Sequence, residues 1–129
     1  MSACGQRFVV QHHCGPGPEH WDLMLEAGEV LATWRLDRHP AGLSDGPIVA
    51  TRIGDHRTAY LTYEGPVSGG RGTVEIVDAG TYTTRRQAAA ALDLDFDGRF
   101  LSGRLTLRCD EPPGDRWTLD RLERSNGPG

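Results

Sequence analysis

Two strands joined by a loop are predicted for the stretch Phe8-Val-Val-Gln-His-His-Cys-Gly-Pro-Gly-Pro-Glu-His-Trp-Asp-Leu-Met-Leu-Glu26. The Gly- and Pro-rich segment 15–18 is predicted to form the loop between them. If the stretch after this loop is a strand, its side chains point alternately to opposite faces. In the second strand this alternation places His20, Asp22 and Met24 on one face and apolar residues on the other. His13 ends the first strand, and the loop returns the chain to His20.

His13, His20 and Asp22 form a candidate metal site. Two imidazoles and one carboxylate leave coordination positions open, which a catalytic metal requires and a closed structural zinc site does not. His12 points to the opposite face of its strand from its neighbour His13, whereas Cys14 adjoins His13 and could compete for a soft metal. The alternative is that these are ordinary polar residues on the exposed face of a hairpin. On these residues alone, both interpretations stay open.

The rest of the chain is predicted to form further short strands, separated by turn signals such as Ala27-Gly28 and Asp97-Gly98. The predicted strands cover residues 7–12, 20–26, 30–36, 48–53, 72–78, 91–97, 99–108 and 117–122. Residues 39–47 are predicted to form a loop, and 85–90 are the one stretch of helical composition, long enough for a turn or two. This pattern predicts an all-β fold, a small single-domain antiparallel β-barrel over residues 7–124 with at most a short helix. Residues 1–6 and 125–129 are predicted to be disordered ends.

Composition supports one ordinary globular domain. The chain has 129 residues, of which 25% are charged and 37% hydrophobic. No apolar run approaches the ~20 residues that span a bilayer, and no secretory leader is evident, so we expect a cytoplasmic protein without a membrane partner. Cys4, Cys14 and Cys109 are an odd number without CxxC spacing, which predicts neither a disulfide framework nor a zinc ribbon.

The charged residues exclude two classes of function. A net charge of −4 and a pI of about 5.7 argue against a non-specific nucleic-acid coat, although a local positive patch would suffice for one strand end. All 14 basic residues are arginine, so the chain cannot form the lysyl-nucleotidyl intermediate of a ligase catalytic domain. The run Asp93-Leu-Asp-Phe-Asp-Gly98 imitates an EF-hand, but Arg104 stands where that loop needs Glu. A solvated strand face is the better interpretation of this run.

The order of motifs resembles the 3′-phosphoesterase domain of bacterial DNA ligase D and its stand-alone relatives. The resemblance runs from Arg7 to Leu122 and rests on many short matches in the family's order. They are Phe8-Val-Val-Gln11, His13, His20-Trp-Asp22, Leu25-Glu26, Val30–Trp34, Asp55-His56, Tyr60, Tyr63-Glu-Gly65, Ser68–Val74, Asp78–Tyr82, Leu92–Leu107 and Trp117–Leu119. The loop between His13 and His20 carries one residue more than the family pattern.

The resemblance implies a metal-dependent phosphoesterase, an enzyme that removes a 3′-phosphate or a 3′-terminal ribonucleotide from DNA or RNA-tipped ends. It assigns His13, His20 and Asp22 to a divalent metal, with Mn²⁺ preferred and Zn²⁺ as the competitor. It assigns His56 to the scissile phosphate and Tyr60 to orienting that phosphate, so these five residues are expected to line a polar central cavity of the barrel. DNA or RNA/DNA 3′ ends are the implied partners, with DNA ligase or end-joining proteins as further candidates, and a monomer is expected.

One departure from the family puts catalysis in question. The family carries an active-site arginine two residues after the metal-binding Asp, and here that position is Met24, which offers neither charge nor donor. A second family arginine falls near Ile48. Arg52, Arg35 or Arg71 are candidates to supply the missing positive charge, with Arg52 and Arg71 also the candidates for contacting a nucleic-acid backbone. If none does so, the alternative is a catalytically impaired, metal-containing module that binds 3′ ends.

Overall fold

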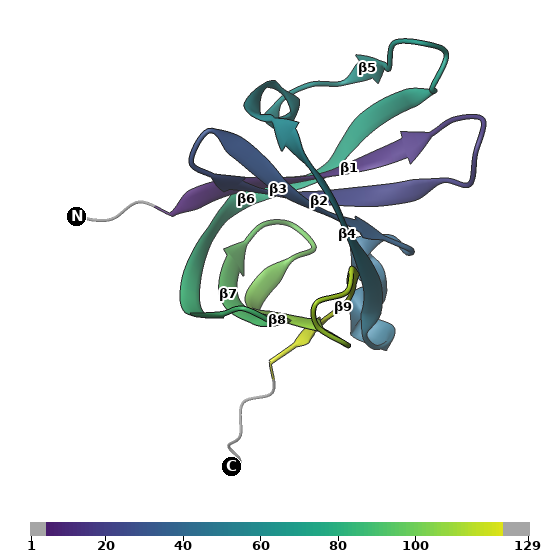
Figure 1. Ribbon diagram of the computed structural model, residues 1–129. Coiled ribbons are helices and arrows are strands. Elements are labelled where there is room, and N and C mark those ends of the chain that lie inside the picture. Colours follow the sequence, from purple (N-terminus) through teal and green to yellow (C-terminus); the bar gives the residue numbers. More distant parts are fainter. Residues whose placement is uncertain (1–4, 123–129) are drawn as a thin grey trace.

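The computed structural model describes residues 5–122, which form a closed antiparallel barrel of eight strands (Figure 1). The order around the barrel is β1-β2-β3-β4-β9-β8-β7-β6, and β6 pairs with β1 to close it. A ninth strand, β5, pairs with the beginning of β6. The strands are β1 (Gln6–Cys14), β2 (His20–Ala27), β3 (Val30–Leu36), β4 (Ile48–Arg57), β5 (Gly65–Pro66), β6 (Thr73–Ala88), β7 (Ala91–Asp97), β8 (Ser102–Cys109) and β9 (Arg116–Arg121). The prediction of an all-β antiparallel barrel is confirmed.

Two short 3₁₀ helices complete the described part, η1 (Pro40–Asp45) and η2 (Thr58–Leu61). β1 begins at Gln6, so the predicted disordered end at 1–6 is wrong at that residue; residues 1–4 and 125–129 lie outside the described residues. Among the residues that the structure describes, no helix is long and apolar enough to cross a membrane. Cys14 and Cys109 are free thiols.

The long strand β6 links the two halves of the barrel. Its first part pairs with β1, from Cys14↔Thr73 to Gln6↔Tyr82, and its second part pairs with β7 as far as Ala88↔Ala91. The two pairings overlap beside Gly80, where a Cβ would lie 2.1 Å from the carbonyl oxygen of Asp97. Only glycine allows this close approach of two backbones.

Two predicted segments differ from the structure because long-range contacts decide their conformation. The helical turn expected at 85–90 is instead the end of β6, whose pairing with β7 outweighs the local alanine-rich composition. The strand expected from residue 99 begins at Ser102, because the carboxylate of Asp78 accepts hydrogen bonds from the N–H groups of 99, 100 and 101, at 2.6 to 3.0 Å. These contacts hold the segment before β8 as a turn.

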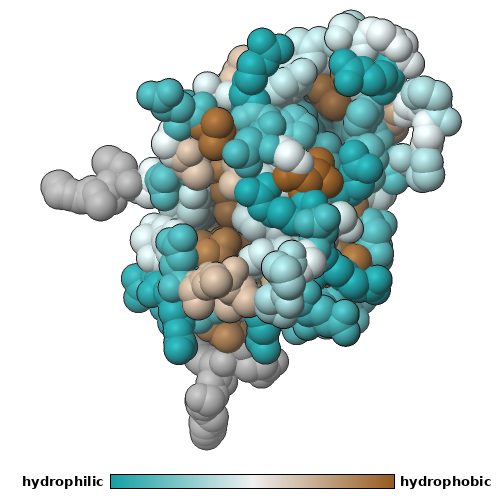
Figure 2. Space-filling view, in the orientation of Figure 1, coloured by the Kyte–Doolittle hydropathy of each residue, from teal (hydrophilic) through white to brown (hydrophobic). Residues whose placement is uncertain are grey.

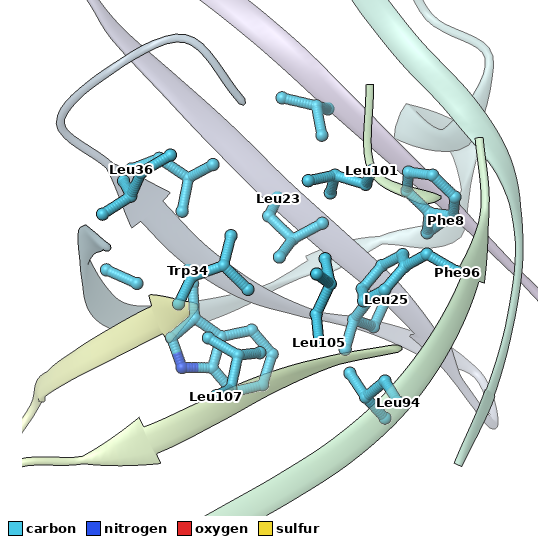
Figure 3. Packing of buried hydrophobic residues seen from close by; sticks show 14 of the residues in the cluster. Phe8, Leu23, Leu25, Trp34, Leu36, Leu94, Phe96, Leu101, Leu105 and Leu107 are labelled. Atoms are coloured by element: carbon cyan, nitrogen blue, oxygen red, sulfur yellow. The ribbon is translucent and has the colours of Figure 1, made fainter. Parts of the chain in front are cut away.

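The interior of the barrel is apolar. Buried side chains from the inward faces of the strands meet there, and Figure 3 shows Leu23 and Leu25 of β2 beside Phe8, Phe96 and Leu105. The expectation of a polar central cavity is therefore wrong. Because side chains alternate along β2, the inward position of Leu23 and Leu25 sends His20, Asp22 and Met24 to the outer face of the barrel.

A second, smaller apolar cluster lies on that outer face. It contains Val9, Met24, Leu31 and Leu61, with Tyr60 packed against it. Leu61 and Tyr60 belong to η2, which, with the segment leading to β5, is drawn above β1 and β6 in Figure 1. Figure 2 shows the molecule in the same orientation in space-filling form, with hydrophilic residues over most of the face turned to the viewer and hydrophobic patches among them.

Candidate metal centre

His13, His20 and Asp22 come together on the outer face where β1 ends and β2 begins. His13 pairs with His20 across the two strands, and Asp22 follows two residues along β2 on the same face. His13 Nδ1 lies 3.2 Å from His20 Nε2, which lies 3.4 Å from Asp22 Oδ2. One ligand atom from each residue lies within 4.8 Å of the others. The three donors are thus close enough to share one ion.

Backbone carbonyls fix the tautomers of both histidines. His13 Nε2 is 2.6 Å from the carbonyl oxygen of Arg71, and His20 Nδ1 is 3.4 Å from that of Pro18. A carbonyl oxygen only accepts hydrogen bonds, so each of these ring nitrogens carries the proton. In the neutral rings, the nitrogens that face each other, His13 Nδ1 and His20 Nε2, are then the ones that present lone pairs. Two lone pairs directed at one point repel each other. A cation that accepts both of them removes this repulsion.

The surroundings of Asp22 fit the same ion. Asp22 is 4% exposed, and its buried Oδ1 atom has no hydrogen-bond partner. Arg35 Nε lies 3.8 Å from that oxygen, too far for a hydrogen bond. Oδ2 is the oxygen that faces His20, so Asp22 offers Oδ2 to an ion shared with the histidines, and a cation beside the carboxylate offsets part of the cost of burying its charge. The donor set of two imidazoles and a carboxylate fits Mn²⁺ and Zn²⁺ alike.

The protonation state of His20 also favours a metal. Burial lowers the pKa of His20 below its ordinary value; the carboxylate of Asp22 partly offsets this effect, and the nearby charge of Arg35 lowers the pKa further. A lowered pKa leaves the imidazole neutral at neutral pH. The neutral imidazole is the form that binds metals, because the protonated ring has no free lone pair.

Two arginines lie at the metal centre. A cavity of about 260 Å³ opens beside the histidines, and Arg35 and Arg71 contribute to its lining. Arg35 lies on β3 directly across from Asp22, and about half of its side chain is exposed. The guanidinium of Arg71 is held by Ser68, through its carbonyl oxygen at 2.8 Å and its hydroxyl at 3.2 Å. This cavity therefore combines the metal donors with positive charge.

His56 and Tyr60 lie on the same outer face, farther along the strands. His56, near the end of β4, has Nδ1 3.1 Å from both the hydroxyl oxygen of Thr33 and the carbonyl oxygen of Gly54. The carbonyl contact places the proton on Nδ1 and leaves Nε2 free to exchange a proton with a ligand. The ring of His56 is 5.7 Å from the ring of Tyr60 and nearly perpendicular to it.

Met24 lies between these two groups. It follows Asp22 by two residues on the same face, and it is the register partner of Thr33, which contacts His56. Its side chain is completely buried in the outer apolar cluster with Leu61 of η2. The metal donors and the pair of His56 and Tyr60 thus lie on either side of one buried apolar residue, Met24.

Known proteins resemble this chain over most of its length. A sequence model of the DNA Ligase D 3′-phosphoesterase domain matches residues 11–108, which include the whole metal centre, His56 and Tyr60. The chain belongs to this family. The multifunctional non-homologous end joining DNA repair protein LigD of Mycobacterium tuberculosis (strain H37Rv) is 34% identical over 129 residues, which cover 92% of this chain and 16% of that protein. The LigD protein of Mycobacterium bovis matches equally. The chain thus spans about one sixth of the length of these relatives.

Within this member of the 3′-phosphoesterase family, the structure does not bring Arg52 to the metal centre. Arg52 pairs in register with Trp34, a residue of the barrel core, and its guanidinium carbon lies 4.8 Å from the centre of that ring. It also donates to the carbonyl oxygens of Ile53 at 2.6 Å and Thr33 at 3.2 Å, and to Asp55 at 3.2 Å. Arg52 therefore has structural partners, and Arg35 and Arg71 are the arginines beside the metal donors.

A residue that sequence reasoning left without a role is Gln11 in the same family motif. It pairs in register with Asp22 and is 1% exposed. Its Nε2 donates to the carbonyl oxygens of Tyr60 at 3.0 Å and Tyr63 at 2.9 Å. Gln11 thus fastens the segment that carries Tyr60 to the strand that carries His13. The signal available in the sequence was its position two residues before His13, which places both side chains on the same face of the predicted strand.

Proposed function

We propose that this chain is a metal-dependent 3′-phosphoesterase. It removes a 3′-phosphate or a 3′-terminal ribonucleotide from a DNA or RNA-tipped strand and leaves a 3′-hydroxyl. The observation that carries the proposal is the convergence of ligand atoms of His13, His20 and Asp22 beside an arginine-lined cavity. Membership of the 3′-phosphoesterase family supports the 3′ end of a nucleic acid as the place of action.

In this proposal His13, His20 and Asp22 hold the divalent ion, with Mn²⁺ preferred over Zn²⁺. When bound, such an ion neutralises phosphate charge and lowers the pKa of a coordinated water. Arg35 binds a phosphate oxygen, because its guanidinium stands directly across from Asp22 and is half exposed. A charge-assisted contact of this kind also orients the ester. Arg71 adds positive charge at the rim of the same cavity.

His56 and Tyr60 act on the other side of the phosphate. Because Thr33 and Gly54 hold Nδ1 of His56, the free Nε2 can donate a proton to a departing oxygen when the ring is protonated. Tyr60 stands beside this ring as a neutral hydroxyl donor. A phosphoester that contacts both the metal centre and His56 passes over the outer apolar cluster, within which Met24 is buried.

The test uses 5′-labelled DNA strands that end in a 3′-phosphate or in one 3′-ribonucleotide, with Mn²⁺, Mg²⁺ or Zn²⁺. We expect conversion to a 3′-hydroxyl by the wild type, and a loss of at least about a hundredfold in rate for Asp22→Asn and for His56→Gln. The exposed Arg121→Gln variant serves as the control and should keep the wild-type rate. An unchanged rate in Asp22→Asn would overturn the metal-dependent mechanism.

A second candidate function is binding without catalysis. It is favoured by Met24, which is buried and uncharged where the family has an arginine. A binding module shows metal-dependent affinity for 3′-phosphate ends and no turnover when the protein is in excess over DNA. In either case the proposed partners are DNA or RNA/DNA 3′ ends and the ligase or end-joining proteins that use them, in keeping with the names of the relatives as end-joining proteins.

A further inference from the structure

A second cavity opens beside Tyr60 and shares no lining residue with the cavity at the metal centre. Its volume is about 280 Å³, and it is formed by the end of β4, by η2 and by the segment around β5. Tyr60, Tyr63, Pro66 and Val67 supply most of its walls, and Arg57 stands at one side. The cavity is therefore aromatic and apolar with a single cation.

The shape and chemistry of these walls suit a flat aromatic ring. The rings of Tyr60 and Tyr63 lie 5.7 Å apart and nearly perpendicular to each other. Tyr63 is 36% exposed and is one of two exposed large hydrophobic residues in the described part of the chain, the other being Val30. An exposed aromatic ring beside a basic residue is the arrangement that single-stranded nucleic-acid binders use to stack bases and hold the backbone.

Several contacts hold this cavity in shape without a ligand. Gln11 donates to the carbonyl oxygens of both tyrosines, and the hydroxyl of Tyr63 donates to the carbonyl oxygen of Pro66. The carboxylate of Glu64 accepts a hydrogen bond from the N–H of Ile76 on β6, at 2.8 Å. A cavity formed in advance loses little entropy when a ligand enters, which strengthens binding.

We propose that this cavity binds the nucleobase at the 3′ end of the strand, by stacking on Tyr63 while Arg57 contacts the backbone. The inference deepens the proposed function and rests on it. Arg57 directly follows His56 in the chain, and the ring of Tyr60 connects His56 to Tyr63. A base held here therefore belongs to the nucleotide whose phosphate is next to His56. Stacking tolerates every base, so this site recognises a terminal nucleotide without selecting its sequence.

The test compares the affinity of two labelled single strands that end in a 3′-phosphate, one with a normal terminal nucleotide and one with an abasic terminal nucleotide. Binding is measured by fluorescence anisotropy in metal-free buffer, so that the proposed reaction does not consume the 3′-phosphate ends. We expect the wild type to bind the normal strand at least about fivefold more tightly, the lower limit for one stacked base. Tyr63→Ala should lose this preference, Tyr63→Phe should keep it, and Arg57→Gln should weaken binding of both strands about equally.

Equal wild-type affinity for the normal and abasic strands would overturn the inference, and this comparison needs no variant that folds poorly. A preference that survives in Tyr63→Ala would also overturn it, because the base would then bind elsewhere. The outcome is separable from that of the proposed function. If turnover is absent but the preference depends on Tyr63, the base site stands without the enzyme; if turnover occurs without the preference, the enzyme stands without the base site.

Discussion

Replacing Met24 with arginine tests how the outer face is built. The sequence predicts that Met24→Arg restores a phosphate-binding charge and raises activity at least about tenfold if the site has room, since ~1.4 kcal/mol of selective stabilisation gives a factor of ten. The structure removes that room. Met24 is 0% exposed and packs with Val9, Leu31 and Leu61 beneath η2. A guanidinium at this position would replace methionine within an apolar cluster.

The cost follows from the burial. Removing a buried methionine side chain costs about 2–5 kcal/mol of unfolding free energy, and burying a charge adds a penalty of several kcal/mol that its own partners rarely repay in full. The long stem of arginine can extend its head towards Asp22 and recover part of this cost. We therefore expect Met24→Arg to lower the free energy of unfolding by at least about 2 kcal/mol. Met24→Leu conserves volume and should cost less than about 1.5 kcal/mol.

The free energy of unfolding of both variants is measured by urea unfolding followed by tryptophan fluorescence. The rate of 3′-phosphate removal is recorded on the same samples. We expect Met24→Arg to be the less stable of the two and no faster than the wild type. Arg35→Met in the wild-type background should lower affinity for 3′-phosphate ends, because Arg35 already supplies the charge beside Asp22. If Met24→Arg is as stable as Met24→Leu and at least about tenfold faster than the wild type, the reasoning from burial is refuted.

Three further predictions concern the framework of the site. Asp78→Ala should lower the unfolding free energy in urea by about 3 kcal/mol or more, since four backbone N–H groups donate to this buried carboxylate; an unchanged midpoint would contradict this. Gln11→Leu should slow 3′-end processing while calorimetric metal affinity stays constant, because it frees the Tyr60 segment and leaves the metal donors in place. Burial raises the pKa of Tyr82 to about 12, so its neutral form stabilises the fold fully below pH ~10, the pKa of an unfolded tyrosine. This contribution is lost as the pH rises towards 12. Unfolding curves at alkaline pH should show the lost stability, and the loss should be smaller in Tyr82→Phe.

Local sequence predicted the strands and the shared face of the metal donors, because alternation in a strand is a local property. It did not predict that this face lies outside the barrel. The direction of each face depends on the closure of the barrel by β1 and β6, which joins residues such as Phe8 and Gly80 that are far apart in the chain. Alternation alone leaves inside and outside undecided, and the expected polar centre was wrong for this reason.

The choice among the arginines could have been made from the sequence. The Ala27-Gly28 turn signal predicts a hairpin, and a pairing of Ala27 with Val30 carries Asp22 into register with Arg35, as the structure has it. The place of Arg52 could not be predicted in the same way, since the loop before β4 sets the register of that strand. The extension of β6 through Arg85 likewise depends on its partner β7 and not on the composition of the segment.

The proposed function depends most on one divalent ion held by His13, His20 and Asp22. Isothermal titration of Mn²⁺ into metal-free protein at neutral pH measures this directly, with His13→Ala, Asp22→Asn and His12→Ala beside the wild type. His12 is the matched control, since it adjoins His13 but its ring stacks on Trp21 and binds Glu19. We predict one ion per chain in the wild type and in His12→Ala, and no measurable binding in the other two variants. Unchanged Mn²⁺ affinity in both His13→Ala and Asp22→Asn would contradict the account.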